Sequence, residues 1–376
     1  MLKQLFLLLV SFGAIVGSIT LQSCATAPLT SETLNQAVTE TRARLGTSAL
    51  SAAVFNQESV IDNKTVGTQS VLVDLPVPND ARWYLGSCTK AMTATLVGRL
   101  VERDVLQFET TVGEVFQESI HPNYKSVSVA QLLRHHGGVT GAISLSHPQI
   151  WQAMWEGMEL DNSQVRRNAV LSILSDPSSQ FPGVFTYSNA GFLVVAAMIE
   201  EITRESWESL IQRELFDPLG MSSAGFSALK GSSPWPHKWS EGRYTAMDPE
   251  EPGAGNPPSL GPAGAVHVSM RDWIKFLQVF LDGGPDGFLS KETLTELVTP
   301  LTNQAAAGWY VVERGWAGGD SLVHAGSNTM NYALVWLAPE KGQGIILATN
   351  GANPDTFQIL DGLAGWMINR YITLVE

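Results

Sequence analysis

The stretch YLGSCTKAMTATLVGRL, residues 84–100, decides how this chain is interpreted. It places Ser87 three positions before Lys90, at the beginning of a segment whose apolar residues recur with helical spacing. Because residues at i and i+3 share a helix face, the spacing predicts that Lys90 lies one turn from Ser87, within hydrogen-bond reach. Partial burial there would lower the pKa of the lysine and make it a proton acceptor for the serine.

A serine three positions before a lysine is a weak signal by itself. The chain holds a second copy at Ser227 and Lys230, but Gly, Ser and Pro follow that copy and interrupt a helix. For the first copy, the alternative is a helix-capping Ser87 beside a solvated Lys90. The free N–H groups of a helix's first turn favour negative charge, which would suit the stabilisation of an oxyanion at Ser87.

Length and composition restrict the class of protein. The chain has 376 residues, 44% of them hydrophobic and 16% charged, so it can form one large or two closely packed domains. A net charge of −13 without basic clusters disfavours nucleic acid as a partner. We find no G-x-S-x-G, H-E-x-x-H, P-loop or G-x-G-x-x-G signature, and we expect neither a metal nor a cofactor.

The N-terminus, MLKQLFLLLVSFGAIVGSITLQSCATAP, predicts an export signal, with a positive Lys3 followed by an uncharged apolar run. The sequence LQSC before Ala25 resembles a bacterial lipobox, which implies a signal peptide over residues 1–23 and lipidation of Cys24. An uncleaved membrane anchor and an ordinary secretory signal are the alternatives. On the lipobox interpretation the protein is an exported, periplasmic or cell-envelope lipoprotein on a membrane, and Cys88 has no disulfide partner.

Expected strands lie at both ends of the chain and helices between them. Apolar runs predict strands at 48–56 and from residue 308 to about 350, a helix over 31–45 capped by Ser31, and a final helix over 355–371. The fold class is therefore α/β (α+β), an antiparallel sheet built from N- and C-terminal segments and flanked by helices. We expect residues 25–104 plus 216–376 to form this domain, 105–215 to form an inserted all-helical domain, and the irregular segment 227–262 to form a lid or rim loop.

Two later motifs add candidate site residues. FTYSNAGF, residues 185–192, carries Tyr187 and Asn189 on a loop at a helix start. A phenol held near an ammonium can accept a nucleophile's proton, and an amide side chain suits an amide-bearing substrate. The alternatives are an ordinary core tyrosine and a helix cap.

LVHAGSNTM, residues 322–330, carries the second set on a strand. His324 would face one side of the sheet, Gly326 would allow close approach of a substrate backbone, and Ser327 would offer an N–H to an oxyanion. The pattern H-x-G also occurs at His135, between expected helices. His135 and His136 lack partners at metal-ligand spacing and are interpreted as ordinary polar residues.

In combination, S-x-x-K, Y-x-N and H-x-G in this order resemble the serine β-lactamase and penicillin-binding protein superfamily, in its class C-like branch. LGSCTKAMTATLVGRLVERDVL, VSVAQLLRHHGGV and GPAGAVHVSMRDWIKFLQ are similar to further blocks of that branch. The resemblance covers most of residues 31–370. It implies a β-lactamase/transpeptidase-like fold with the site between the sheet domain and the helical domain.

The resemblance also implies roles for the candidate residues. Ser87 would be the acylated nucleophile, Lys90 and Tyr187 would share its proton, and Asn189 would position Lys90 and substrate. The N–H groups of Ser87 and Ser327 would form the oxyanion hole. His324 would occupy the position of a lysine in class C enzymes, and because histidine is cationic only conditionally, recognition of a substrate carboxylate is less assured.

The expected function is an exported serine hydrolase that acts through a Ser87 acyl-enzyme on amide or ester bonds. Small-molecule or peptide substrates of the D-amino-acid peptide, ester and β-lactam types are expected in that order. The alternative is a non-hydrolysing, penicillin-binding-like sensor or cell-wall ligand-binding protein.

Overall fold

The structure is a computed structural model that describes residues 28–117, 120–178, 180–229, 231–285 and 287–373. The expected signal peptide over 1–23 and the expected lipidation site Cys24 lie outside the described residues. Within the described ranges, none of the helices has the length and apolar character needed to span a bilayer.

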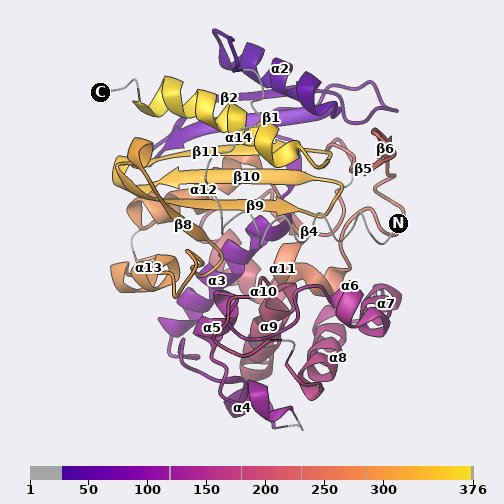
Figure 1. Ribbon diagram of the computed structural model, residues 1–376, viewed down its shortest axis with the longest axis vertical. Helices are drawn as coiled ribbons and strands as arrows, with labels where there is room; N and C mark the ends of the chain where they lie inside the picture. The colour runs from indigo at the N-terminus through magenta and orange to yellow at the C-terminus, as the bar shows by residue number, and fades with distance from the viewer. Residues whose placement is uncertain (1–27, 118–119, 179, 230, 286, 374–376) are drawn as a thin grey trace.

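One six-stranded antiparallel sheet joins the two ends of the chain, in the order β2-β1-β11-β10-β9-β8. Its strands are β1 Ala49–Asn56, β2 Val60–Gly67, β8 Tyr310–Arg314, β9 Gly319–Ser327, β10 Tyr332–Ala338 and β11 Gln343–Thr349. β1 pairs with β11, with Leu50 opposite Thr349. The expected α/β fold with an antiparallel sheet built from both chain ends is therefore confirmed (Figure 1).

Helices bury both faces of this sheet. Alternate residues of β1 point to opposite faces, so Leu50 and Val54 pack into one apolar cluster with α2 and α14, while Ala53 and Phe55 join a second, larger cluster. The larger cluster contains residues of α12 and α3. The helices of this region are α2 Leu34–Leu45, α3 Thr89–Val101, α12 Met270–Asp282, α13 Lys291–Val298 and α14 Thr356–Met367.

Local capping fixes where the flanking helices begin. The expected cap of the first helix, Ser31, is wrong by two residues: Thr33 caps α2, because Thr33 and Gln36 form a reciprocal capping box. Ser269 caps α12 by accepting the N–H of Asp272, and Gly283 ends that helix in the left-handed conformation. The last helix, α14, continues into a π-helical turn over Ile368–Thr373.

The middle of the chain is helical and lies below the sheet in Figure 1. Its helices are α4 Val112–Val115, α5 Val129–Leu133, α6 Ile143–Ser146, α7 Pro148–Glu156, α8 Asn162–Ser175, α9 Asn189–Thr203 and α10 Trp207–Ile211. Val194 in α9, Leu96 in α3 and Phe276 in α12 are fully buried members of the larger cluster. The helical segment therefore shares its apolar core with the sheet region.

The segment after α10 contributes strands to two small sheets. β3 Arg82–Tyr84, β7 Val266–Ser269 and β4 Gly225–Phe226 form a three-stranded sheet, and β5 His237–Ser240 pairs with β6 Arg243–Ala246. A 3₁₀ turn, η4 Pro258–Leu260, then leads into the short helix α11 Gly261–Gly264. Pro262 and Ala263 are buried, so the end of the irregular segment lies inside the molecule.

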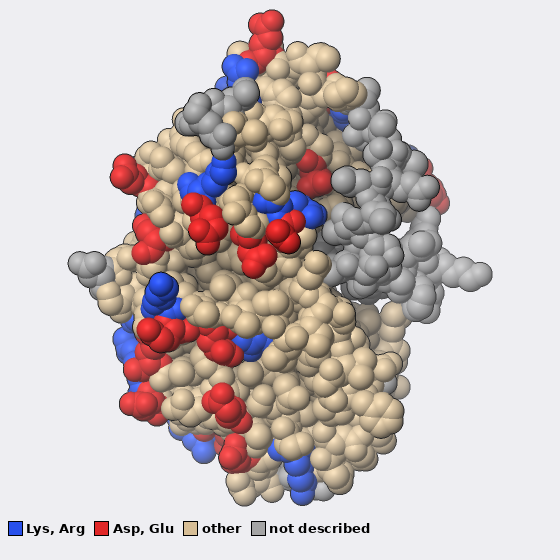
Figure 2. All heavy atoms as spheres, turned by 60° about the vertical axis from the view of Figure 1, so that its left-hand side comes forward, with Lys and Arg blue, Asp and Glu red and all other residues tan. Residues whose placement is uncertain are grey.

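Charged side chains of both signs share the surface. Figure 2 shows acidic and basic residues lying next to one another over one face. Ion pairs between partly exposed side chains include Arg44–Glu40, Arg167–Glu201 and Arg204–Glu201. Exposed pairs of this kind contribute about 0–1 kcal/mol each, so we attribute the fold mainly to its buried clusters.

Candidate active site

Ser87 lies in a short 3₁₀ turn, η1 Gly86–Cys88, that leads directly into α3. The turn requires glycine before the serine: Gly86 has φ 51°, and a Cβ at this position would lie 2.5 Å from the backbone nitrogen of Ser327. Ser87 is half-buried, whereas both of its neighbours in the turn are buried. The serine hydroxyl is therefore held on a rigid turn at the start of a buried helix.

Lys90 lies one turn further along, with its whole side chain buried. Its Nζ donates to Ser87 Oγ at 3.1 Å, to Asn189 Oδ1 at 2.8 Å and to the carbonyl of Ala263 at 2.7 Å. No carboxylate of a described residue pairs with it. Burial therefore lowers the pKa of Lys90 to about 7, which makes the neutral amine accessible near neutral pH.

Tyr187 approaches Ser87 from the loop before α9. Its hydroxyl donates to Ser87 Oγ at 2.8 Å, so this oxygen lies between the phenol and the amine. Burial of the hydroxyl raises the pKa of Tyr187. The phenol therefore carries its proton at neutral pH and acts as a hydrogen-bond donor.

The start of α9 fixes the loop that carries both Tyr187 and Asn189. Ser188, not Asn189, is the helix cap: its Oγ accepts the N–H of Gly191 at 2.9 Å and donates to the carbonyl of Thr140 at 2.7 Å. The amide oxygen of Asn189 is therefore free to accept from Lys90.

Strand β9 packs directly against the serine turn. A Cβ at Gly326 would lie 2.0 Å from the carbonyl oxygen of Leu85 and 2.7 Å from the nitrogen of Ser87, so only glycine permits this approach. The hydroxyl of Ser327 donates to the carbonyl of Asn331, within the turn that follows. The backbone of Ser327 therefore lies against the serine turn, whereas its side chain forms a hydrogen bond within the turn that follows β9.

His324 lies two residues before Gly326, on the same face of β9, and is 2% exposed. Burial, and secondarily the Lys90 ammonium, lower the pKa of His324 to about 3. An interaction with the backbone of Ala325 opposes this shift, and Nδ1 of the ring has no hydrogen-bond partner among the described residues. His324 is thus a neutral imidazole, and it does not supply the positive charge of a lysine at this position.

The structure brings the candidates Ser87, Lys90, Tyr187 and Asn189 into one hydrogen-bonded group. Gly326, Ser327 and His324 lie beside it on β9. The competing serine is elsewhere: Ser227 has φ 71°, follows the short strand β4 and donates its hydroxyl to the carbonyl of Phe226. Among the described residues, no cluster of three or more His, Cys, Asp and Glu could hold a metal ion.

Two contributors were missed by the sequence interpretation. One is the carbonyl of Ala263, a backbone group that only the tertiary fold could bring to Lys90. The other is His135, whose ring lies against the ring of Tyr187 with centroids 4.5 Å apart. The H-x-G pattern at His135 was the available signal, but sequence spacing could not show that this histidine lies beside the tyrosine loop.

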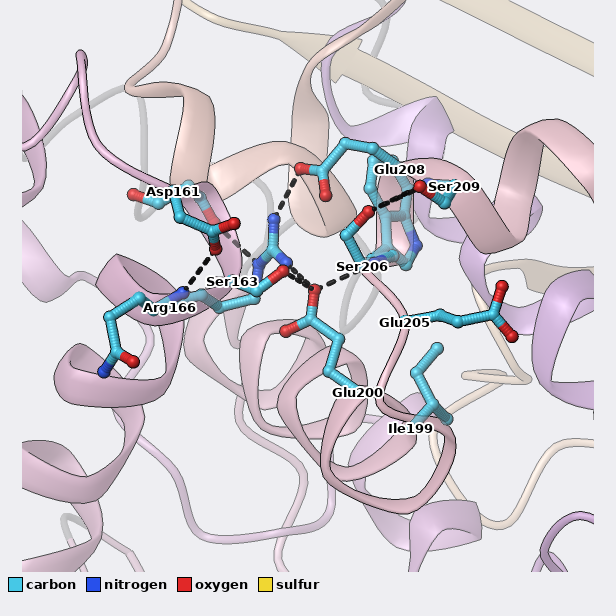
Figure 3. A network of polar contacts seen from close by, with 12 residues as sticks. Asp161, Ser163, Arg166, Ile199, Glu200, Glu205, Ser206, Glu208 and Ser209 are labelled. Atoms are coloured by element: carbon cyan, nitrogen blue, oxygen red, sulfur yellow. Dashed lines mark hydrogen bonds and ion pairs between the residues drawn. The ribbon is translucent and has the colours of Figure 1, made fainter.

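Figure 3 shows a network of polar contacts around Arg166, Glu200 and Glu208. The fully buried guanidinium of Arg166, in α8, pairs with Glu200 and with Glu208 and donates through Nε to the carbonyl of Ser259 at 3.0 Å. Ser259 belongs to η4, immediately before α11. The helical segment thus holds the turn from which Ala263 reaches Lys90.

A family model and a curated relative both connect this chain with β-lactamases and penicillin-binding proteins. A family model described as "Beta-lactamase" matches residues 34–365. "Penicillin-binding protein 4" of Amycolatopsis lactamdurans is 26% identical over 320 residues, covering 77% of this chain and 79% of that protein.

Two solved structures show the same fold at low identity. The octameric penicillin-binding protein homologue from Pyrococcus abyssi superposes with a TM-score of 0.72 at 20% identity, over 89% of this chain and 76% of that one. D-amino acid amidase from Ochrobactrum anthropi SV3 superposes with a TM-score of 0.70 at 18% identity, over 90% and 99%.

Proposed function

The chain belongs to the beta-lactamase family, and from this premise we propose that it is a serine acyl hydrolase that forms an acyl-enzyme on Ser87. The observation that carries the proposal is the position of Ser87 Oγ, which lies 3.1 Å from Lys90 Nζ and 2.8 Å from Tyr187 Oη. A nucleophile within hydrogen-bond reach of a base is the arrangement that activation of a serine requires.

We assign the general base to Lys90. A neutral amine has two N–H donors and one lone pair. Because Asn189 Oδ1 and the Ala263 carbonyl accept the two donors, the lone pair of the neutral amine would face the Ser87 hydroxyl. Because burial lowers the pKa of Lys90 to about 7, its neutral form is accessible near neutral pH.

In the proposed acylation step, every proton that moves has a donor and an acceptor among the reacting groups. Lys90 takes the Ser87 proton as Oγ bonds to the substrate carbonyl carbon, and the carbonyl oxygen becomes an oxyanion that accepts the N–H groups of Ser87 and Ser327. When the tetrahedral intermediate collapses, Tyr187 gives its proton to the leaving amine or alkoxide, and the Lys90 ammonium restores the phenol. A water molecule then attacks the ester, with Lys90 again taking the proton and Ser87 regaining its own.

The substrate proposed is an ester or amide, with D-amino-acid derivatives preferred over β-lactams. The neutral state of His324 argues for this order, because no cation is then available at this position for a substrate carboxylate. One structural neighbour is named D-amino acid amidase, which agrees with the preference for D-amino-acid derivatives. We further propose that the protein is exported and associates with a membrane through a lipidated Cys24.

A substrate panel tests the proposal. Purified protein would be given a p-nitrophenyl ester, a D-amino-acid amide and a chromogenic cephalosporin, and product formation would be followed over many equivalents of enzyme. We expect turnover of the ester or the amide by wild type and by Ser227→Ala, and loss of turnover in Ser87→Ala. Stoichiometric acylation of Ser87 without turnover would instead support the sensor, and equal turnover by Ser87→Ala would exclude the proposed nucleophile.

A further inference from the structure

His135 contacts three consecutive residues around the candidate tyrosine. The carbonyl of His135 accepts the N–H of Thr186 at 2.8 Å, and its Nδ1 accepts the N–H of Ser188 at 3.0 Å. Between these two hydrogen bonds, its ring lies against the Tyr187 ring at 4.5 Å between centroids and 35° between planes. His135 therefore holds the backbone on both sides of Tyr187 and one face of its ring.

The geometry of His135 itself is constrained. It is 4% exposed and has φ 62°, a left-handed conformation that costs non-glycine residues about 1 kcal/mol or more. Its ring also contacts Phe192 and Phe185, with centroids at 5.5 and 6.0 Å. Strained residues of this kind persist only when their surroundings determine them, and they concentrate at functional sites.

The surroundings of the ring keep it neutral. The titratable groups that act on it are Lys90 from α3, His324 from β9 and the adjacent His136, and no carboxylate does so among the described residues. Burial, followed by Lys90, places the pKa of His135 well below its usual value. Since a protonated ring would have a donor at Nδ1, where Ser188 also presents an N–H, the neutral ring is the form that fits this contact.

We propose that His135 is a positioning residue for the reaction, which fixes Tyr187 so that its hydroxyl reaches Ser87. This inference rests on the proposed function, because the position of a phenol matters only if the phenol takes part. His135 touches neither Ser87 nor, on the proposed mechanism, the substrate, so it acts through Tyr187. A displacement of about 1 Å in such a group can lower a rate about a hundredfold.

Two substitutions separate the contacts that His135 makes. His135→Asn keeps a side-chain acceptor near the Nδ1 position and tolerates a positive φ, but it loses the ring. His135→Phe keeps a ring and loses the acceptor. We expect kcat for the substrate found by the panel to fall about tenfold in His135→Asn and about a hundredfold in His135→Phe, with KM changed less than threefold.

A double-mutant cycle with Tyr187→Phe distinguishes a positioning role from a merely structural one. It compares the effect of each His135 substitution in the presence and in the absence of the Tyr187 hydroxyl. If His135 acts through the phenol hydroxyl, adding His135→Asn or His135→Phe to Tyr187→Phe should lower kcat for the panel substrate less than threefold. Rates that fall by the same factor in both backgrounds would overturn the inference, as would a change confined to KM. Should His135→Phe fail to fold, the His135→Asn arm of the cycle decides the question.

The failure of the proposed function would look different. In that case wild-type protein would show no labelling of Ser87 at all, and the cycle would have no starting rate. If wild-type Ser87 is labelled but a His135 substitution lowers the rate by the same factor with and without the Tyr187 hydroxyl, the proposed function is retained and only the positioning role of His135 is rejected.

Discussion

At the scale of single residues, the proposed chemistry depends on Lys90, which pairs with no carboxylate among the residues that the structure describes. Lys90 is surrounded by a hydroxyl, an amide oxygen and a carbonyl. These groups accept its hydrogen bonds, but they cannot offset the free energy lost when a full charge is removed from water. Burial therefore decides its protonation state. The sequence spacing predicted the contact with Ser87, but the depth of burial that lowers the pKa came only from the packing of α3.

The pH dependence of acylation follows from this lysine. The base form of Lys90 predominates above its pKa of about 7, so the rate of Ser87 labelling should rise with pH, pass its half-maximum near pH 7 and level off above pH 8. Stopped-flow or quenched labelling with a neutral fluorophosphonate between pH 5 and 9 would measure it. A rate that is flat across this range, or that falls as pH rises, would contradict the assignment of Lys90 as the base.

His324 gives a second prediction at this scale. His324→Lys would place another ammonium near Lys90, and a like charge disfavours the protonated form of its neighbour. We therefore expect the half-maximum of the pH profile to move below that of wild type by about one pH unit. His324→Gln, which adds no charge, is the matched control and should leave the midpoint in place. A midpoint that moves upward in His324→Lys would show that the two groups do not interact as described.

At the scale of elements, the decisive contact is between strand β9 and the serine turn η1. The sequence analysis placed Gly326 on a strand and interpreted it as allowing a substrate backbone to approach. In the structure, the close approach is made by the protein's own backbone at Leu85 and Ser87. Sequence spacing could not reveal this contact, because it joins segments more than two hundred residues apart.

Gly326→Ala tests this contact. A Cβ that meets backbone atoms at 2.0 and 2.7 Å must push β9 away from η1, and overpacking of this kind costs about 1–3 kcal/mol. We expect Ser87 labelling to slow by at least about a hundredfold, because the proposed oxyanion donor Ser327 moves with the strand. Gly319→Ala, on the same strand with only a flexible glutamate nearby, is the control and should label at nearly the wild-type rate. Equal rates for the two variants would contradict the packing described.

At the scale of the whole molecule, much of the architecture was predictable from the sequence. Apolar runs at both chain ends predicted one antiparallel sheet, and the pairing of β1 with β11 confirms it. The helical middle was visible in the spacing of its apolar residues. What the sequence did not reveal is the continuity of the core, because Val194 and Leu96 show helical spacing without showing their partners.

Arg166 links the helical segment to the turn that carries Ala263. Removal of one member of a buried ion cluster typically costs about 3–5 kcal/mol, since the remaining charges stay buried without a partner. We therefore expect Arg166→Met to lower the free energy of unfolding by about that amount in urea titrations. It should also slow Ser87 labelling, because the turn that carries Ala263 loses the anchor at Ser259.

Arg167→Met is the matched comparison one residue away. Arg167 is partly exposed and pairs with Glu201 on the surface, so its removal should cost about 0–1 kcal/mol. Similar losses of stability in the two variants, or unchanged labelling in a folded Arg166→Met protein, would show that the buried cluster does not support the site.

The most direct measurement of the central claim is the site of covalent modification. A fluorophosphonate bonds to an activated serine oxygen through phosphorus and releases fluoride. Peptide mapping of the labelled protein should locate the added mass on Ser87, in wild type and in Ser227→Ala alike, and Ser87→Ala should take up no label. Label that persists in Ser87→Ala, on Ser227 or on any other residue, would contradict the account.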